Sequence, residues 1–207
     1  MIITDKIAIT RMPRTGSTWC RDVVLACLGS EATNLVKDGS VAVAQHTTWR
    51  DAKVRAAPRL ASLVSFVQVR NPHQWLRSLH SFAVQREGAK TIKVMGQGCV
   101  QNLARLYDDD FNLFASNVNV LKQGIVSSIY AAYTEGVDFI GTTEHCSRDL
   151  YAALYLAGHR PAMRNWSDAP VNCSTRKAAW DTTLAAEFEQ SEAEAFAIWN
   201  KALTHRF

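Results

Sequence analysis

The sequence lacks the features that mark several specialised classes of protein. Its 207 residues include five cysteines, an odd number, widely spaced and without a CxxC pair, which argues for reduced thiols rather than a disulfide framework. No apolar run approaches the roughly 20 residues of a membrane span. The first residues lead straight into a predicted strand, which leaves no room for a signal peptide. We therefore expect a cytoplasmic protein that does not contact a membrane.

Internal repeats, low-complexity tracts and linkers are also missing, so residues 1–207 are expected to form a single domain with one full core. The net charge of +4 is far from that of a nucleic-acid-binding arm. It suits a small anionic ligand instead. We therefore expect no nucleic-acid partner.

Apolar strand patterns alternate with amphipathic helix patterns along the chain. Strands are predicted over residues 7–9, 39–44, 63–69 and 137–143. Helices are predicted over 17–28, from 72 onward, over 100–107, 111–133 and 147–157, and from 181 to the end as one long closing helix. Residues 50–58 are predicted to cross the surface, and 85–98 to form a loop. This order predicts an α/β fold with a mainly parallel central sheet flanked by helices.

The first strand runs into a tight loop and then a helix, within Ile7–Val24. A loop that contains Gly16 and several hydroxyls, placed before a helix N-terminus, is suited to hold an anion. The Walker A pattern GxxxxGK[ST] fits it poorly. Arg11 replaces the first glycine, and Ser17 stands where the nucleotide-binding lysine belongs.

A second strand-to-helix junction follows residues 63–69. Nucleoside triphosphatases usually end a neighbouring strand in an aspartate that organises Mg²⁺, but here the strand is followed by Arg70. Asn71 is a good N-cap and Pro72 suits the first helical position, so a helix is predicted to begin there. A cation at Arg70 repels Mg²⁺ and attracts phosphate. The pair of junctions therefore predicts a phosphate-bearing ligand without an obligatory metal.

Together the two junctions resemble the sulfotransferases that use 3′-phosphoadenylyl sulfate (PAPS). Residues 13–19, PRTGSTW, are similar to the 5′-phosphosulfate loop of that family. Arg70-Asn71-Pro72, with Ser78 eight residues after Arg70, is similar to its 3′-phosphate motif. Residues 140–161 and 171–176 are more weakly similar to Golgi-type and bacterial carbohydrate sulfotransferases. The resemblance implies a three-layer, P-loop-like fold.

The resemblance also implies PAPS as donor, adenosine 3′,5′-bisphosphate (PAP) as product, and no metal. Trp19 would lie near the adenine, although packing in the core is an equally good interpretation of this residue. A further basic pair in the last third of the chain would reach the 3′-phosphate. The implied donor-binding residues are Arg14, Thr15, Gly16, Ser17, Thr18, Trp19, Arg70, Ser78, Arg176 and Lys177.

Two residues are candidates for the chemistry. Arg14 would stabilise the leaving phosphate, because a planar guanidinium can bridge phosphate and sulfuryl oxygens. His46 would be the general base. It lies where cytosolic members carry Lys-x-His, but Ala44 replaces that lysine here, and a carboxylate base is the alternative. His73 and His80 lack a third metal ligand and are predicted to lie on a solvated helix face.

The expected function is transfer of a sulfuryl group to a hydroxyl or an amine of a carbohydrate or other small molecule. Two alternatives stay open: a divergent P-loop nucleotide kinase, and a non-catalytic nucleotide-binding module.

Overall fold

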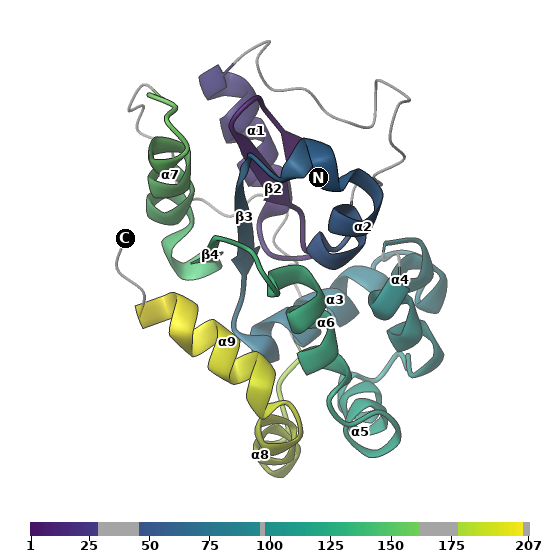
Figure 1. Ribbon diagram of the computed structural model, residues 1–207. Coiled ribbons are helices and arrows are strands. Elements are labelled where there is room, and N and C mark those ends of the chain that lie inside the picture. Colours follow the sequence, from purple (N-terminus) through teal and green to yellow (C-terminus); the bar gives the residue numbers. More distant parts are fainter. Residues whose placement is uncertain (29–45, 96–97, 162–177, 205–207) are drawn as a thin grey trace.

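A computed structural model describes residues 1–28, 46–95, 98–161 and 178–204, and its centre is a four-stranded sheet (Figure 1). The strands are β1 (Ile2–Ile3), β2 (Ile7–Thr10), β3 (Val64–Val69) and β4 (Phe139–Thr142), in that spatial order. β2, β3 and β4 are parallel, and β1 is antiparallel to β2. The predicted α/β class with a mainly parallel sheet is confirmed. The predicted strand at 39–44 lies outside the described residues.

Helices connect and cover these strands. They are α1 (Ser17–Leu28), α2 (Trp49–Leu60), α3 (Pro72–Val84), α4 (Ala89–Met95), the 3₁₀ helix η2 (Gly98–Arg105), α5 (Phe111–Leu121), α6 (Ile125–Thr134), the short η3 (Thr143–His145), α7 (Cys146–Leu156), α8 (Thr182–Ser191) and α9 (Ala193–Thr204). None of the helices in the described part of the chain combines the length and the apolar character needed to cross a bilayer.

Apolar residues of the strands alternate between the two faces of the sheet, as the period of two requires. Ile7, Ile9 and Phe66 pack with buried residues of α1 and α7. Val67 and Val69 belong instead to the largest cluster, which includes residues of α3, α5, α6 and α9. The core therefore continues on both sides of the sheet.

The register brings the ends of three strands to one edge of the sheet. Thr10 pairs with Val67, and Val69 pairs with Thr142. The carboxyl ends of β2, β3 and β4 therefore lie along one edge, where open α/β sheets commonly bind ligands. Both junctions singled out in the sequence leave the sheet at this edge.

Two segments predicted without regular structure are helical. Residues 50–58, predicted to cross the surface, belong to α2, which begins after Thr48 accepts a hydrogen bond from the Asp51 amide at 3.1 Å. The predicted loop at 85–98 contains α4 instead, anchored by the fully buried Ile92. Arg50, Lys53 and Val54 of α2 are exposed, in agreement with the predicted surface position. The loop prediction was wrong because a few buried contacts outweigh glycine-rich composition.

Two predicted long helices are each broken into two. The helix predicted over 111–133 ends at α5 and restarts at α6, where Gly124 has a left-handed φ of 76°. The closing helix breaks at Glu192, between α8 and α9. The buried Glu192 carboxylate accepts a hydrogen bond from the Ser127 amide at 2.7 Å, which caps the first turn of α6. Burial raises the pKa of this carboxyl group.

Candidate functional site

The loop between β2 and α1 has a strained backbone. Gly16 has a φ of 76° and Arg14 has a φ of 63°, both in the left-handed region. This region costs a non-glycine residue roughly 1–2 kcal/mol. An arginine in place of a relaxed glycine suggests that its side chain is needed at this point.

The loop turns its carbonyl groups toward the protein. The buried Thr15 hydroxyl donates to the Met12 carbonyl at 2.9 Å. The Trp75 indole N–H donates to the Pro13 carbonyl at 2.8 Å, and Arg70 Nη1 lies 3.5 Å from the Arg14 carbonyl. Three consecutive carbonyl oxygens, which would repel an anion, are therefore engaged by side chains.

The two sequence motifs meet at the sheet edge. Arg14 Nε donates to Ser78 Oγ at 3.2 Å, although the two residues are 64 positions apart. Arg70 reaches the same loop through the Arg14 carbonyl. Residues predicted to bind the two ends of one nucleotide thus lie around one small region that contains two guanidinium groups and a hydroxyl.

The ring of Phe82 on α3 packs against the guanidinium group of Arg14. The guanidinium carbon of Arg14 lies 4.4 Å from the Phe82 ring centroid, and that of Arg86 lies 4.3 Å from the same centroid. Such cation–π contacts hold a guanidinium without neutralising its charge. The Arg14 guanidinium therefore keeps its positive charge in this contact.

His46 lies beside Arg11, the first residue of the loop. Its Nδ1 lies 2.8 Å from the Arg11 carbonyl. A carbonyl only accepts, so Nδ1 carries the proton and Nε2 keeps its lone pair. Burial, followed by the positive charge of Arg11, lowers the pKa of His46 to about 4. The imidazole is therefore uncharged at neutral pH, as removal of a proton from a hydroxyl requires.

Two tyrosines of α6 position the segments on either side, and sequence reasoning missed both. The Tyr133 hydroxyl donates to the His46 carbonyl at 2.6 Å. The Tyr130 hydroxyl donates to the Arg70 carbonyl, also at 2.6 Å. Both rings are fully buried, as is that of Trp75. The sequence signal that could have identified them is that a buried tyrosine or tryptophan needs a hydrogen-bond partner for its polar group.

The remaining predicted donor-binding residues lie in the first turn of α1, in the core, or outside the described residues. Ser17 and Thr18 lie in the first turn of α1, directly after Gly16. Trp19 is 8% exposed and packs in the cluster formed with α7, so its side chain lies in the core. Arg176 and Lys177 lie outside the described residues.

The prediction of a solvated helix face for His73 and His80 was wrong. His80 is buried, its Nε2 lies 3.0 Å from the Asp108 carbonyl, and its ring stacks on Phe114. His73 packs edge-on against Trp180, with ring centroids 4.8 Å apart. Both histidines serve packing between helices. Within the described ranges no group of three or more His, Cys, Asp or Glu side chains could hold a metal ion.

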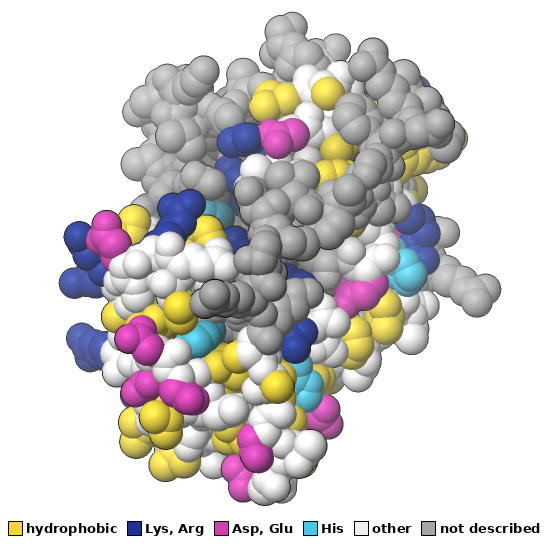
Figure 2. Space-filling view, turned by 180° about the vertical axis from the view of Figure 1, so that it is seen from behind, with side chains coloured by type: hydrophobic (Ala, Val, Ile, Leu, Met, Phe, Trp, Pro, Cys, Tyr) yellow, Lys and Arg dark blue, Asp and Glu magenta, His cyan; other side chains and the backbone are white. Residues whose placement is uncertain are grey.

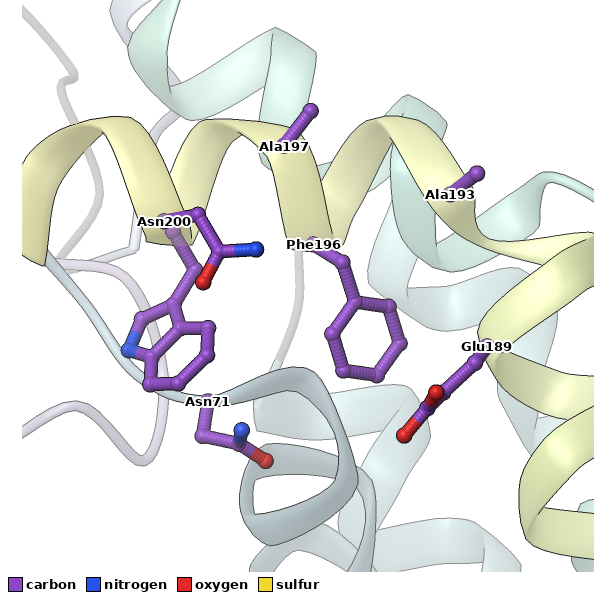
Figure 3. Close-up of a pocket in the computed structure, with 7 residues that line it drawn as sticks. Asn71, Glu189, Ala193, Phe196, Ala197 and Asn200 are labelled. Carbon is purple, nitrogen blue, oxygen red and sulfur yellow. The ribbon is translucent and has the colours of Figure 1, made fainter.

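A pocket of about 440 Å³ lies where α3 begins, between that helix and α8 and α9 (Figure 3). It starts at Asn71, the residue after Arg70, and Figure 3 shows Asn71, Glu189, Phe196 and Asn200 around one space. Aromatic faces combined with a few polar groups are typical of small-molecule sites. The lining residues are Asn71, Glu189, Ala193, Phe196, Ala197, Trp199 and Asn200.

Charge is separated along the molecule. Seen from behind in Figure 2, acidic side chains gather over the end that carries α5 and α8, whereas lysine and arginine side chains lie higher on this face. Asp108, Asp109 and Asp110 precede α5, and Glu187 and Glu189 belong to α8. The acidic end is thus distinct from the loop that carries Arg14.

Comparisons with protein-family models, with curated proteins and with solved structures found no match to this chain.

Replacing Trp75 with phenylalanine tests the support of the loop. We expect the free energy of unfolding to fall by about 1–2 kcal/mol, because the buried Pro13 carbonyl loses its donor. Trp49→Phe is the matched control, since the Trp49 indole N–H also donates to a carbonyl, that of Gly136, at 2.9 Å.

Urea denaturation should show similar losses for both variants. Only Trp75→Phe should also weaken binding of an anionic nucleotide several-fold, measured by calorimetry. Equal nucleotide affinities for the two variants would show that the indole does not position the loop.

Proposed function

We propose that this chain is a PAPS-dependent sulfotransferase that acts on a hydroxyl, or an amine, of a carbohydrate or other small molecule in the cytoplasm. The proposal includes a three-layer, P-loop-like arrangement of the sheet and its helices. The observation that carries it is the contact between Arg14 and Ser78, which joins the two motifs at the carboxyl edge of the parallel strands.

The residues at this edge fit a ligand with several anionic groups. Arg14 and Ser17 would hold the 5′-phosphosulfate, together with Thr15, Gly16 and Thr18. Arg70 and Ser78 would hold the 3′-phosphate. Guanidinium groups bind phosphate oxygens through charge-assisted, often bidentate hydrogen bonds, which suits two arginines better than two lysines.

The donor supplies a sulfuryl group whose transfer leaves negative charge on the phosphate oxygen that departs. Arg14 would stabilise that charge, and its contacts with Phe82 and Ser78 support this role because they restrict its side chain. Glycine would adopt the left-handed backbone at this position without strain. The presence of arginine is explained if the charge of its side chain is needed for the reaction.

His46 would remove the acceptor proton. Its Nδ1–H bond to the Arg11 carbonyl orients the ring, and Nε2 is the atom that takes up the proton. The His46 carbonyl accepts a hydrogen bond from the Tyr133 hydroxyl, so both the side chain and the backbone of His46 are held in place.

The pocket at Asn71 is our candidate for part of the acceptor site. Its aromatic residues Phe196 and Trp199 could contact the apolar face of a sugar, and its amide and carboxylate groups could bind hydroxyls.

Calorimetry with PAP in the presence of EDTA tests the proposal directly. We expect saturable binding that does not depend on a divalent metal, and radiolabelled sulfate transfer to at least one acceptor in a hydroxyl and amine panel. Preference for ATP with Mg²⁺ would favour the nucleotide kinase instead. PAP binding without transfer to any acceptor would favour the non-catalytic module.

Arg70→Ala should weaken PAP binding by about 10- to 100-fold, the usual cost of losing one charge-assisted hydrogen bond. The matched control is Arg105→Ala, which removes the same charge from an exposed position at the end of η2. Calorimetry on both variants separates a local contact from a general loss of positive charge. Equal affinities would refute the role of Arg70.

A further inference from the structure

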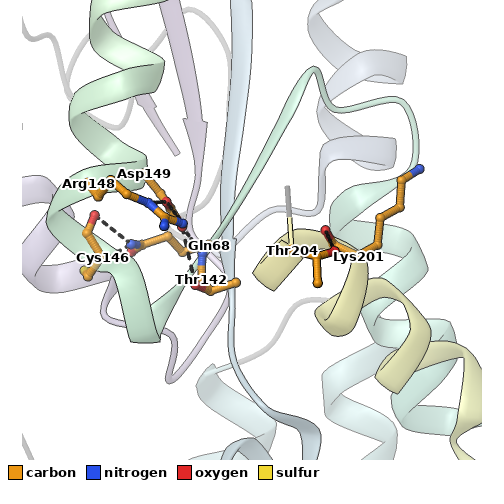
Figure 4. A network of polar contacts seen from close by, with 7 residues as sticks. All are labelled: Gln68, Thr142, Cys146, Arg148, Asp149, Lys201 and Thr204. Carbon is orange, nitrogen blue, oxygen red and sulfur yellow. Dashed lines mark hydrogen bonds and ion pairs between the residues drawn. The ribbon is translucent and has the colours of Figure 1, made fainter. Parts of the chain in front are cut away.

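Two cysteines contact the same glutamine side chain next to the loop. Cys20 is on α1 and Cys146 is the first residue of α7. The side chain of Gln68 from β3 joins them. Its Oε1 accepts from the Cys20 thiol. Its Nε2 lies 3.0 Å from Cys146 Sγ, and Figure 4 shows Gln68 beside Cys146. Cys20 belongs to the apolar cluster against which Cys146 packs.

The two thiols differ in access. Cys20 is 2% exposed, whereas Cys146 is half-buried and has a route to solvent. Burial, followed by the interaction with Cys146, raises the pKa of the Cys20 thiol well above its usual range. Cys146 lies at the positive end of the α7 dipole, which favours negative charge on its sulfur. An oxidant would therefore meet Cys146 first.

The cysteine pair touches the last residue of the loop. A Cβ atom added to Gly16 would lie 3.7 Å from both Cys146 Sγ and Gln68 Oε1. The Cys20 amide donates to the Gly16 carbonyl at 3.0 Å. A change in the bonding of these sulfurs therefore acts on the loop at its junction with α1.

We propose that Cys20 and Cys146 form a redox modification site that a peroxide converts to a disulfide. The Cys146 thiolate attacks one peroxide oxygen, which breaks the O–O bond, gives a sulfenic acid and releases an alcohol or water. The Cys20 thiol then attacks the Cys146 sulfur, the S–S bond forms, and the sulfenic oxygen leaves as water with the Cys20 proton. Two thiols lose two electrons in total, and the peroxide gains them.

The disulfide has a defined effect on its surroundings. It links α1 to α7 and removes the S–H donor that Gln68 Oε1 now accepts from. The Gln68 carboxamide must then reorganise next to Gly16. We expect the oxidised loop to bind an anionic nucleotide at least tenfold more weakly, a consequence that rests on the proposed function, whereas formation of the disulfide does not.

Peptide mapping of the full chain after treatment with hydrogen peroxide tests the proposal. We expect a Cys20–Cys146 cross-linked peptide that disappears on reduction with dithiothreitol and in Cys146→Ser. Cys27→Ser is the control, since Cys27 lies on the same helix as Cys20 and should leave the cross-link unchanged. In Cys20→Ser, dimedone should label the sulfenic acid at Cys146.

Oxidation that pairs other cysteines, or that takes Cys146 to higher oxides without a cross-link in the native chain, would overturn the proposal. PAP titrations of both redox forms then separate the two claims. Equal binding by both forms would exclude coupling to the loop. A cross-link with no PAP binding in either form would support the redox site and contradict the sulfotransferase.

Discussion

Replacing His46 with asparagine is expected to lower the turnover number by about 10²- to 10⁴-fold, the usual contribution of a general base. The asparagine amide can still donate to the Arg11 carbonyl, as His46 Nδ1 does at 2.8 Å, but it cannot accept a proton from the substrate. The Kd for PAP should therefore stay close to that of the native chain. Unchanged turnover would remove His46 from the mechanism and favour a carboxylate base.

The pH dependence supplies a second test of the same residue. The pKa of His46 in the free protein is lowered to about 4, mainly by burial. The base is therefore neutral throughout the range from pH 5 upward, and kcat/KM should fall only as the pH decreases through about 4. An acidic limb near 6.5 would contradict the buried position of the ring.

The same shift affects stability. Between pH 6.5 and 4 the unfolded chain protonates His46 while the folded chain does not, so the free energy of unfolding falls as the pH is lowered through this window. The expected loss from this group is roughly 2–3 kcal/mol. Urea denaturation at pH 7 and pH 4.5 should show a smaller loss for His46→Asn than for the native chain.

Replacing Arg14 with glycine is expected to lower kcat by about 10²- to 10³-fold, the usual cost of removing one group that stabilises charge in the transition state. Stability should change little. Relief of the left-handed backbone at Arg14 is worth roughly 1–2 kcal/mol. It is offset by loss of the Ser78 hydrogen bond and the Phe82 contact, each worth about 1 kcal/mol.

Arg14→Lys is the informative companion, because it keeps the charge and loses the planar fork. We expect it to recover most of the activity that Arg14→Gly loses, measured as sulfate transfer at saturating donor. If glycine at this position were as active as arginine, the cation would have no part in the reaction. If glycine unfolded the protein, the balance of strain and contacts would be wrong.

Local signals account for the parts of the fold and site that sequence reasoning could predict. Asn71 caps α3 by accepting from the Gln74 amide at 3.2 Å, and Pro72 begins that helix, as expected. The apolar run at 63–69 is a central parallel strand, because its side chains face the core on both sides. Such features depend on neighbouring residues and are visible in the order of the chain.

Long-range contacts account for what sequence reasoning missed. Tyr133 holds His46 across 87 residues, and Trp75 holds Pro13 across 62. The closing helix breaks at Glu192 because its carboxylate caps α6, 65 residues away. No local pattern predicts such partners, since each depends on which segments the folded core brings together.

The sequence alone therefore determined which residue types stand at the two junctions. The first is a loop with Gly16, several hydroxyl groups and Arg14. The second is a strand followed by Arg70, with Ser78 eight residues further along the chain. Tertiary structure alone decided that Arg14 and Ser78 touch, that His46 is half-buried and neutral, and that two cysteines contact Gln68 next to Gly16. The physical reason is that residue types carry charge and hydrogen-bonding capacity, whereas burial and proximity arise only when distant segments pack.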